Sequence, residues 1–283
     1  MKRFLLTLLT LALVAALIAL ALMPTATRQY RLSQNAKVTS GYQDAVRGLS
    51  LLDCDTLLAQ AEAYNQALGS TGWVDPFSPA SGDSGDGEAY AALLNPAGNG
   101  VMAVLEVPKL GISQAVYHGG ASDSPTARVS HVPRSQLPAK GAPGPCLLSA
   151  TRERFYDPLA GLGRLMEGDC FFLHVLQETW TYEVFQVAVV APEALAEFQA
   201  TEDDECALVV ATTEKGREAR LVARGRRVPR RSAKPVDDSR PLPNGVPELI
   251  FAAPVAAVGL ALLAVVEWVR RSVRRHKRRR MKL

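Results

Sequence analysis

Two long apolar runs frame the chain. The first, Phe4 to Met23, has about 20 residues with threonine as its only polar type, and such a helix spans the roughly 30 Å core of a bilayer. The second, Leu249 to Val266, contains Pro254, which membrane helices tolerate. The pattern predicts an anchor within residues 1–27 and a second transmembrane helix over 248–269. The alternatives are a signal peptide, whose apolar core is shorter, for the first run and a buried core helix for the second.

The pattern between these runs begins as helical and then changes. Leucine and alanine recur at helical spacing in LLDCDTLLAQAEAYNQALG, which ends at Gly69, so residues 28–73 are expected to form a helical region. Residues 74–98 are rich in Gly, Ser, Pro and Asp, which predicts a loop. A loop of this length in a compact domain is usually mobile or functional.

From Val101 onward the hydrophobic pattern is that of short strands. The runs are VMAVLEVP, ISQAVYHG, PCLLSAT, DCFFLHVL, TWTYEVFQVAVV, CALVVATT and ARLVARGRRV. Seven or eight such strands with few helices between them predict a mostly β domain, a closed or nearly closed barrel, over residues 99–230. The Pro-rich stretch 231–247 reads as a linker to the second anchor.

Charge is segregated along the 283 residues, although the net charge is only +4. Lys2 and Arg3 precede the first run, and a strongly basic tail over 270–283 follows the second, whereas the middle of the chain is acidic. Basic residues flanking membrane helices are held in the cytoplasm, so both termini are expected inside and the central domain outside. The acidic middle argues against a nucleic-acid partner and leaves the membrane as the partner of the basic ends.

Cysteine and histidine give no sign of a metal site. Cys54, Cys146, Cys170 and Cys206 form no CxxC pair and no cluster with histidine, and the acidic run 201–205 lacks the ligand spacing of an EF-hand. No metal and no cofactor is therefore predicted.

Several segments together resemble a known family, in the right order and over nearly the whole chain. They are YNQAL, the Asp75-Pro76-Phe77 loop, LNPAGNGVMAVLEVPKLGISQAVYHGG, SHVPRSQLPAKG, MEGDCFFLHVLQETWTYEVFQVAVVAP and ARLVARGRRVP. In these the chain resembles class C sortases, the membrane-anchored cysteine transpeptidases that polymerise pilins on Gram-positive bacteria. The resemblance implies an eight-stranded sortase-like β-barrel.

The resemblance also implies where the catalytic residues would stand. In the family a thiolate attacks the threonine carbonyl of a sorting signal, an amine resolves the thioester, and a histidine and an arginine assist. Here Thr151 stands at the histidine position and Ala211 at the cysteine position, while Arg220, nine residues on, is retained. His118 and His131 match positions outside the catalytic trio and are expected to be structural.

This departure predicts a degenerate active site. Cys206 is no substitute, because an offset of five residues puts it on the opposite face of a strand and about 16 Å from position 211. The leading prediction is a non-catalytic pseudo-sortase of the cell membrane that binds a sorting signal, a pilin or an active sortase. The alternatives are an enzyme of pilus assembly or cell-wall anchoring that acts through other residues, such as His131 with Thr151, and a decayed copy.

The resemblance gives two geometric expectations. Asp75, Pro76 and Phe77 resemble the family's lid, which predicts an ion pair between Asp75 and Arg220 and a mobile flap. The strands that lead to positions 151 and 211 are parallel neighbours in the family. Cys146 and Cys206 precede these positions by equal offsets and should lie close together, where a disulfide depends on suitable Cβ geometry.

Overall fold

The structure, a computed structural model, describes residues 2–69, 73–78, 87–119, 127–140, 144–198 and 204–229. The predicted linker, second transmembrane helix and basic tail lie outside these residues. The described residues divide into two units, 2–29 and 30–229. Each is described by itself.

The amino-terminal helix α1 (Lys2–Arg47) passes through Pro24 without ending. Its stretch from Thr10 is long and apolar enough to cross a membrane, with a mean hydropathy of 2.0 and none of the most apolar part buried. This agrees with the predicted anchor in length and composition.

From Tyr30 onward α1 belongs to the second unit and is fastened to the barrel. The hydroxyl of Tyr42 donates to the carbonyl of Met102 and accepts from the amide of Leu176, both at 2.9 Å. Burial raises the pKa of Tyr42 to about 12, which keeps this hydroxyl protonated as a donor. Asn35 donates to the carbonyl of Ser113 at 2.7 Å and accepts from the amide of Ala115 at 3.0 Å. The helix thus satisfies backbone groups that the strands leave unpaired.

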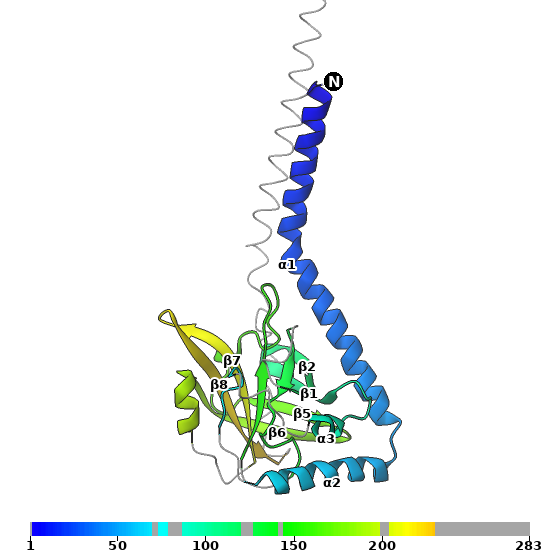
Figure 1. The fold of residues 1–283 in the computed structure, drawn as a ribbon, viewed down its shortest axis with the longest axis vertical. Coiled ribbons are helices and arrows are strands. Elements are labelled where there is room, and N and C mark those ends of the chain that lie inside the picture. Colours follow the sequence, from blue (N-terminus) through cyan, green and yellow to red (C-terminus); the bar gives the residue numbers. More distant parts are fainter. Residues whose placement is uncertain are drawn as a thin grey trace, which may run out of the picture. The chain divides into compact units, whose positions relative to one another are not determined.

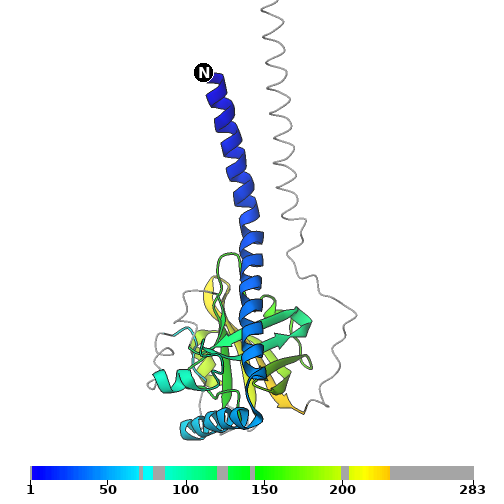
Figure 2. The same cartoon turned by 90° about the vertical axis from the view of Figure 1, so that its right-hand side faces the viewer.

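The second helix, α2 (Leu51–Leu68), ends at Gly69 as the sequence predicts. Ser50 and Asp53 form a capping box, in which each side chain pairs with the other's backbone amide, and Gly69 adopts a positive φ of 68° at the carboxyl end. The buried Asn65 accepts from the amide of Leu137 at 2.8 Å and donates to that residue's carbonyl at 3.1 Å. Figures 1 and 2 both place α2 across one end of the barrel.

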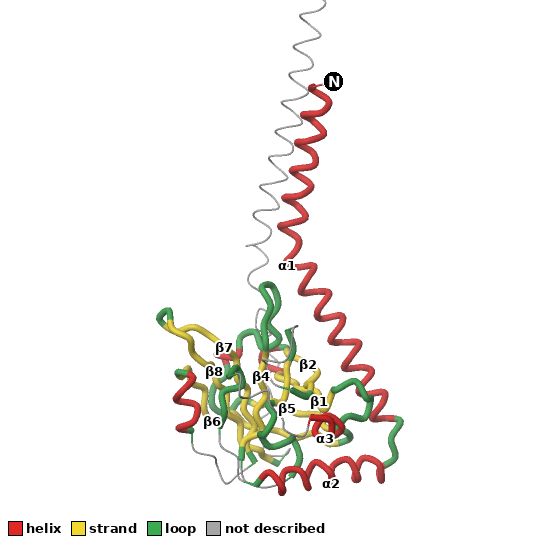
Figure 3. The backbone as a smooth tube through the Cα atoms, in the orientation of Figure 1, coloured by secondary structure: helices red, strands yellow, loops and turns green. Residues whose placement is uncertain are grey.

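Eight strands form the barrel, which confirms the predicted architecture (Figure 3). They are β1 (Val101–Val107), β2 (Ile112–Tyr117), β3 (Val129–His131), β4 (Pro145–Ala150), β5 (Cys170–Val175), β6 (Glu178–Val190), β7 (Glu205–Glu214) and β8 (Arg217–Val228). The closed order is β1-β2-β3-β4-β7-β8-β6-β5. The β4–β7 and β2–β3 pairs are parallel and the others antiparallel.

Two elements differ from the sequence prediction. Strand β3 was not predicted, because three residues are too few to display an alternating pattern. The stretch 74–98, expected to be a loop throughout, contains the short helix α3 (Gly87–Ala92), which buries Tyr90. Burial of this one aromatic ring outweighs the weak helical signal of so short a segment.

The strands bury both of their faces. Cys206, Leu208 and Val210 of β7 join the main cluster of buried residues, to which β4 contributes its own even-numbered residues. The odd-numbered Ala207 and Val209 join a second cluster, beneath Trp73 and Leu195. Because side chains alternate along a strand, β7 therefore points Cys206 and Ala211 to opposite faces, as expected.

Candidate functional site

The three positions singled out in the sequence come together where β4 ends beside β7, which continues to Glu214. The parallel register pairs Ala150 with Val210, so that Thr151 and Ala211 follow at the same level of the sheet. In the antiparallel β7–β8 pair, Arg220 lies directly opposite Ala211. The parallel β4–β7 pair and the β7–β8 hairpin thus bring together three residues that span about 70 positions of the chain.

Arg220 is the electrostatic centre of this site. Its side chain is only 3% exposed, and its guanidinium holds the carboxylate of Asp75 with two hydrogen bonds of 2.7 Å, one from Nε and one from Nη2. Its Nη1 forms an ion pair of 2.8 Å with the exposed Glu218. The hydrogen bond with Asp75 raises the pKa of Arg220 further, so the guanidinium is always charged. The predicted Asp75–Arg220 contact is confirmed.

Residues 73–78, which we call the lid segment, lie over this part of the sheet. The ring of Phe77 covers the Arg220 guanidinium, with its centroid 4.8 Å from Cζ, and the Phe77 amide donates to Asp75 at 3.2 Å. Phe77 also packs against the second cluster of buried residues. An ion pair, a cation–π contact and apolar burial therefore hold the lid segment down at once.

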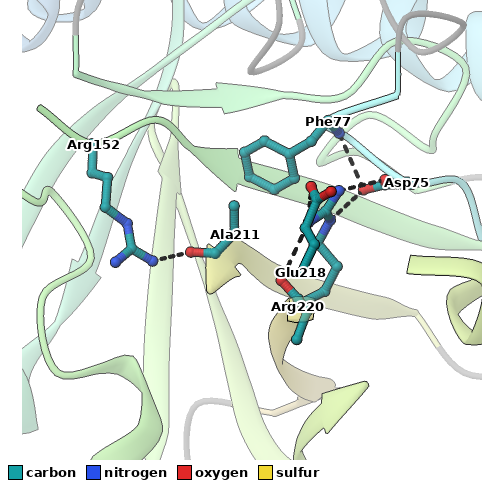
Figure 4. Close-up of polar contacts among 7 residues, drawn as sticks. Asp75, Phe77, Arg152, Ala211, Glu218 and Arg220 are labelled. Atoms are coloured by element: carbon teal, nitrogen blue, oxygen red, sulfur yellow. Dashed lines mark hydrogen bonds and ion pairs between the residues drawn. The ribbon is translucent and has the colours of Figure 1, made fainter. Parts of the chain in front are cut away.

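Arg152 is a residue of the site that sequence reasoning missed. It follows Thr151 and donates from Nη2 to the carbonyl oxygen of Ala211, with Asp157 4.0 Å from its Nε. Figure 4 shows Arg152 approaching Ala211 from one side while Arg220, Asp75 and Phe77 gather on the other. The strand position that the family resemblance assigns to the nucleophile thus has an arginine on each side.

The next residue, Glu153, faces α1. Its carboxylate forms an ion pair with Arg31, with a hydrogen bond of 3.1 Å from Nε, and accepts from the amide of Ala127 at 3.2 Å. This pair connects the segment after β4 to the helix within the second unit. The sequence offers no signal for it, because 122 residues separate Arg31 from Glu153.

A second arginine, Arg224, lies on the same face of β8, four residues beyond Arg220 and opposite Ala207. Arg224 forms an ion pair with Glu205 through hydrogen bonds of 2.6 and 3.0 Å, and both side chains are almost completely buried. The rings of Trp73, Phe185 and Phe198 lie 4.9 to 5.0 Å from its guanidinium carbon. Trp73 therefore fastens the base of the lid segment to the sheet.

The histidines near the barrel are held away from this site. His131 is buried, with Nδ1 2.7 Å from the Tyr90 hydroxyl and Nε2 2.9 Å from the Gln136 carbonyl. His118 lies with its two ring nitrogens 3.0 and 2.7 Å from the carbonyls of Gly100 and Leu93. Both rings link β strands to neighbouring loops, in keeping with the structural role expected of them. Among the described residues, no group of three or more His, Cys, Asp or Glu side chains has a metal-binding arrangement.

Comparison with known proteins identifies the fold. The sortase domain model matches residues 105–228. The structure is similar to sortase C1 of Streptococcus agalactiae, at 27% identity and a TM-score of 0.59 over 68% of this chain and 98% of that one. It is also similar to sortase C-1 of Actinomyces oris, at 28% identity and a TM-score of 0.55 over 62% and 98% of the two chains. A search of curated proteins finds no match. The chain therefore carries a sortase domain over residues 105–228, and sortase C proteins are among its structural neighbours.

Proposed function

We propose that this chain is a membrane-anchored pseudo-sortase, which binds a sorting-signal peptide in its cleft without cleaving it. The observation that carries the proposal is the side chain at position 211. A methyl group there, opposite Arg220 and beside Thr151, offers no thiolate to attack a carbonyl and no imidazole to transfer a proton. The peptide would come from a pilin or another cell-wall protein, and an active sortase is the alternative occupant.

The binding features of the site support this role. Arg220 is charged, shielded from water and matched to a carboxylate or carbonyl, and the partly buried Phe77 provides apolar surface above the sheet. The alternative of catalysis by His131 with Thr151 receives no support, because both ring nitrogens of His131 already have partners on other segments. The proposal therefore assigns binding, rather than turnover, to the cleft.

Opening the lid segment should strengthen peptide binding. Asp75→Asn removes one charge of the bidentate pair, so less free energy is needed to lift the lid segment off Arg220. Each ~1.4 kcal/mol removed from that cost multiplies the apparent affinity by about ten, and we expect a gain of about tenfold or more. Fluorescence anisotropy with a labelled LPxTG-type peptide measures the dissociation constant.

Glu218→Gln is the matched control. Glu218 pairs with the same guanidinium, but its side chain is 69% exposed and lies outside the lid segment, so its removal should change the affinity less than twofold. Equal affinities for the wild type and both variants would contradict the lid's role. No binding by any of the three, with the fold intact by circular dichroism, would contradict the proposed function.

The proposed topology makes a separate prediction. The basic residues Lys2 and Arg3 and the basic tail over 270–283 flank the two predicted anchors on the same side. A reporter enzyme that works only in the cytoplasm should therefore be active when fused to either end of the chain. Protease added to intact protoplasts should digest the barrel. A carboxyl terminus that is labelled from outside would contradict the two-pass arrangement.

A further inference from the structure

Strand β7 is longer than its neighbour β4, which leaves part of its edge without a strand partner. The parallel pairing ends at Ala150 and Val210, whereas β7 continues to Glu214 and is paired with β8 over that whole length. Among the described residues, no strand pairs with the β4 side of residues 211–214. An edge of this kind is where an extended peptide can add to a sheet as a further strand.

The side chain of Arg152 occupies this edge. Its Nη2 donates to the carbonyl oxygen of Ala211, the first residue beyond the paired stretch (Figure 4). Because backbone groups alternate in direction along a strand, those of Thr213 point to the same edge as those of Ala211. A peptide strand that continues the line of β4 needs the Ala211 carbonyl as its first acceptor. Arg152 and such a peptide therefore compete for one oxygen atom.

Arg152 can leave this position without disturbing the core of the barrel. Its side chain is 47% exposed, and its Nε lies 4.0 Å from Asp157, whose side chain is 30% exposed. Ionic contacts near the surface are worth little, so moving the guanidinium into water costs little free energy. The contact with Ala211 is thus suited to displacement by a ligand.

Residues 151–157, which we call the strap segment, are held more firmly than this one side chain. Glu153 and Tyr156 form a short turn in which the amide of each donates to the carbonyl of the other, at 2.8 and 3.3 Å. The hydroxyl of the buried Tyr156 accepts from Nε2 of Gln114 on β2, at 2.8 Å. The turn therefore stays on the barrel while the exposed Arg152 side chain can move.

Helix α1 fastens the strap segment to itself. Two hydrogen bonds join the guanidinium of Arg31 to the carboxylate of Glu153, and both side chains are only 27% exposed. Asn35, about one helical turn further along, binds the β2 backbone on either side of Gln114. Because Glu153 directly follows Arg152 in the chain, its pair with Arg31 limits the positions that the Arg152 backbone can adopt.

We propose that Arg152 closes the free edge of β7 against peptide and that the Arg31–Glu153 pair holds it closed, so that α1 regulates access to the cleft. The inference rests on the proposed function, because the peptide that competes with Arg152 is the one assigned to that cleft. Binding then has two separate costs, lifting the lid segment from Arg220 and displacing Arg152 from Ala211. A movement of α1 that separates Arg31 from Glu153 lowers the second cost alone.

Fluorescence anisotropy with the labelled LPxTG-type peptide tests the proposal on full-length protein that carries Asp75→Asn, in which the lid segment is already released. Arg152→Ala frees the Ala211 carbonyl and should increase the affinity about fivefold, as expected for a partly exposed, charged hydrogen bond. Arg31→Ala should increase it about threefold, because the strap segment is then loosened but Arg152 remains. In the presence of Arg152→Ala, the change Arg31→Ala should add nothing, since it acts only through Arg152.

Two matched variants control for the loss of charge and for a general effect on α1. Arg154→Ala removes the same charge from the strap segment, but its guanidinium lies over the Phe155 ring, 5.6 Å from the centroid, so the affinity should not change. Arg47→Ala breaks a pair with Asp44 on α1 in which both side chains are exposed, and it should likewise have no effect.

The outcomes distinguish this inference from the proposed function. Affinities that are equal for Arg152→Ala, Arg31→Ala and their parent would overturn the inference and leave the proposed function standing. Gains from the two variants that simply add, or a gain from Arg154→Ala as large as that from Arg152→Ala, would also overturn it. No binding by any variant, with the fold intact by circular dichroism, would overturn both.

Discussion

A thiol at position 211 and an imidazole at position 151, introduced together, should give peptide cleavage that neither substitution gives alone. Ala211→Cys by itself supplies a thiol with an ordinary pKa of roughly 8.5, only a few per cent ionised at neutral pH. It also lacks a proton donor for the leaving amine, and general acid–base help is typically worth about 10²–10⁴-fold. The double variant should therefore exceed Ala211→Cys by about 10²-fold or more in thioester formation, followed by mass spectrometry of an LPxTG-type peptide.

The structure explains why recovery should be partial. Arg220 is in place opposite position 211, but Asp75 occupies its guanidinium and Phe77 lies over it. Arg152 also holds the carbonyl of residue 211 and lies next to the new imidazole. Adding Asp75→Asn to the double variant should raise its rate again, because the peptide then meets an open lid.

Two outcomes would decide against this interpretation. Turnover by the unmodified chain would overturn the non-catalytic proposal outright. A double variant no faster than Ala211→Cys, although it folds and binds peptide, would mean that position 151 does not correspond to the family's histidine.

Neutralising Glu205 should destabilise the barrel more than any other single charge change. Its side chain is fully buried and forms two hydrogen bonds with Arg224. The Nη1 of Arg224 also donates to the side-chain oxygen of Gln186 on β6 at 2.8 Å. Glu205→Gln keeps the size of the side chain but leaves the Arg224 charge buried without its counterion. Breaking a buried pair in this way costs about 3–5 kcal/mol.

Asp204→Asn provides the matched control one residue away. Asp204 forms an ion pair with Arg227, but the two side chains are 42% and 23% exposed, and such a pair is worth about 0–1 kcal/mol. Chemical denaturation of the protein gives both free energies of unfolding. Equal losses in the two variants would show that burial does not make the Glu205–Arg224 pair more important to stability than the more exposed Asp204–Arg227 pair.

The sequence by itself determined the features that depend on local pattern. Alternating apolar residues predicted seven of the eight strands, and a leucine-rich helical stretch ending at Gly69 predicted α2. Family resemblance added Asp75 and Arg220 as partners, and equal offsets placed Cys146 opposite Cys206. The strands and α2 follow from the pattern of neighbouring residues, whereas the two residue pairs follow from segments whose order along the chain resembles that of a known family.

Tertiary structure alone decided which distant side chains share a charge or a cavity. Three contacts join segments that no periodicity in the sequence connects. They are Arg152 with the Ala211 carbonyl, Glu205 with Arg224 beneath Trp73, and His131 with Cys146. The local sequence pattern of a charged or aromatic residue is the same whether its side chain lies in water or beneath the lid segment, so the pattern does not predict its burial. Their roles here arise because the lid segment and residues 192–198 cover one face of β7 and β8, and only this packing determines which charges are enclosed there.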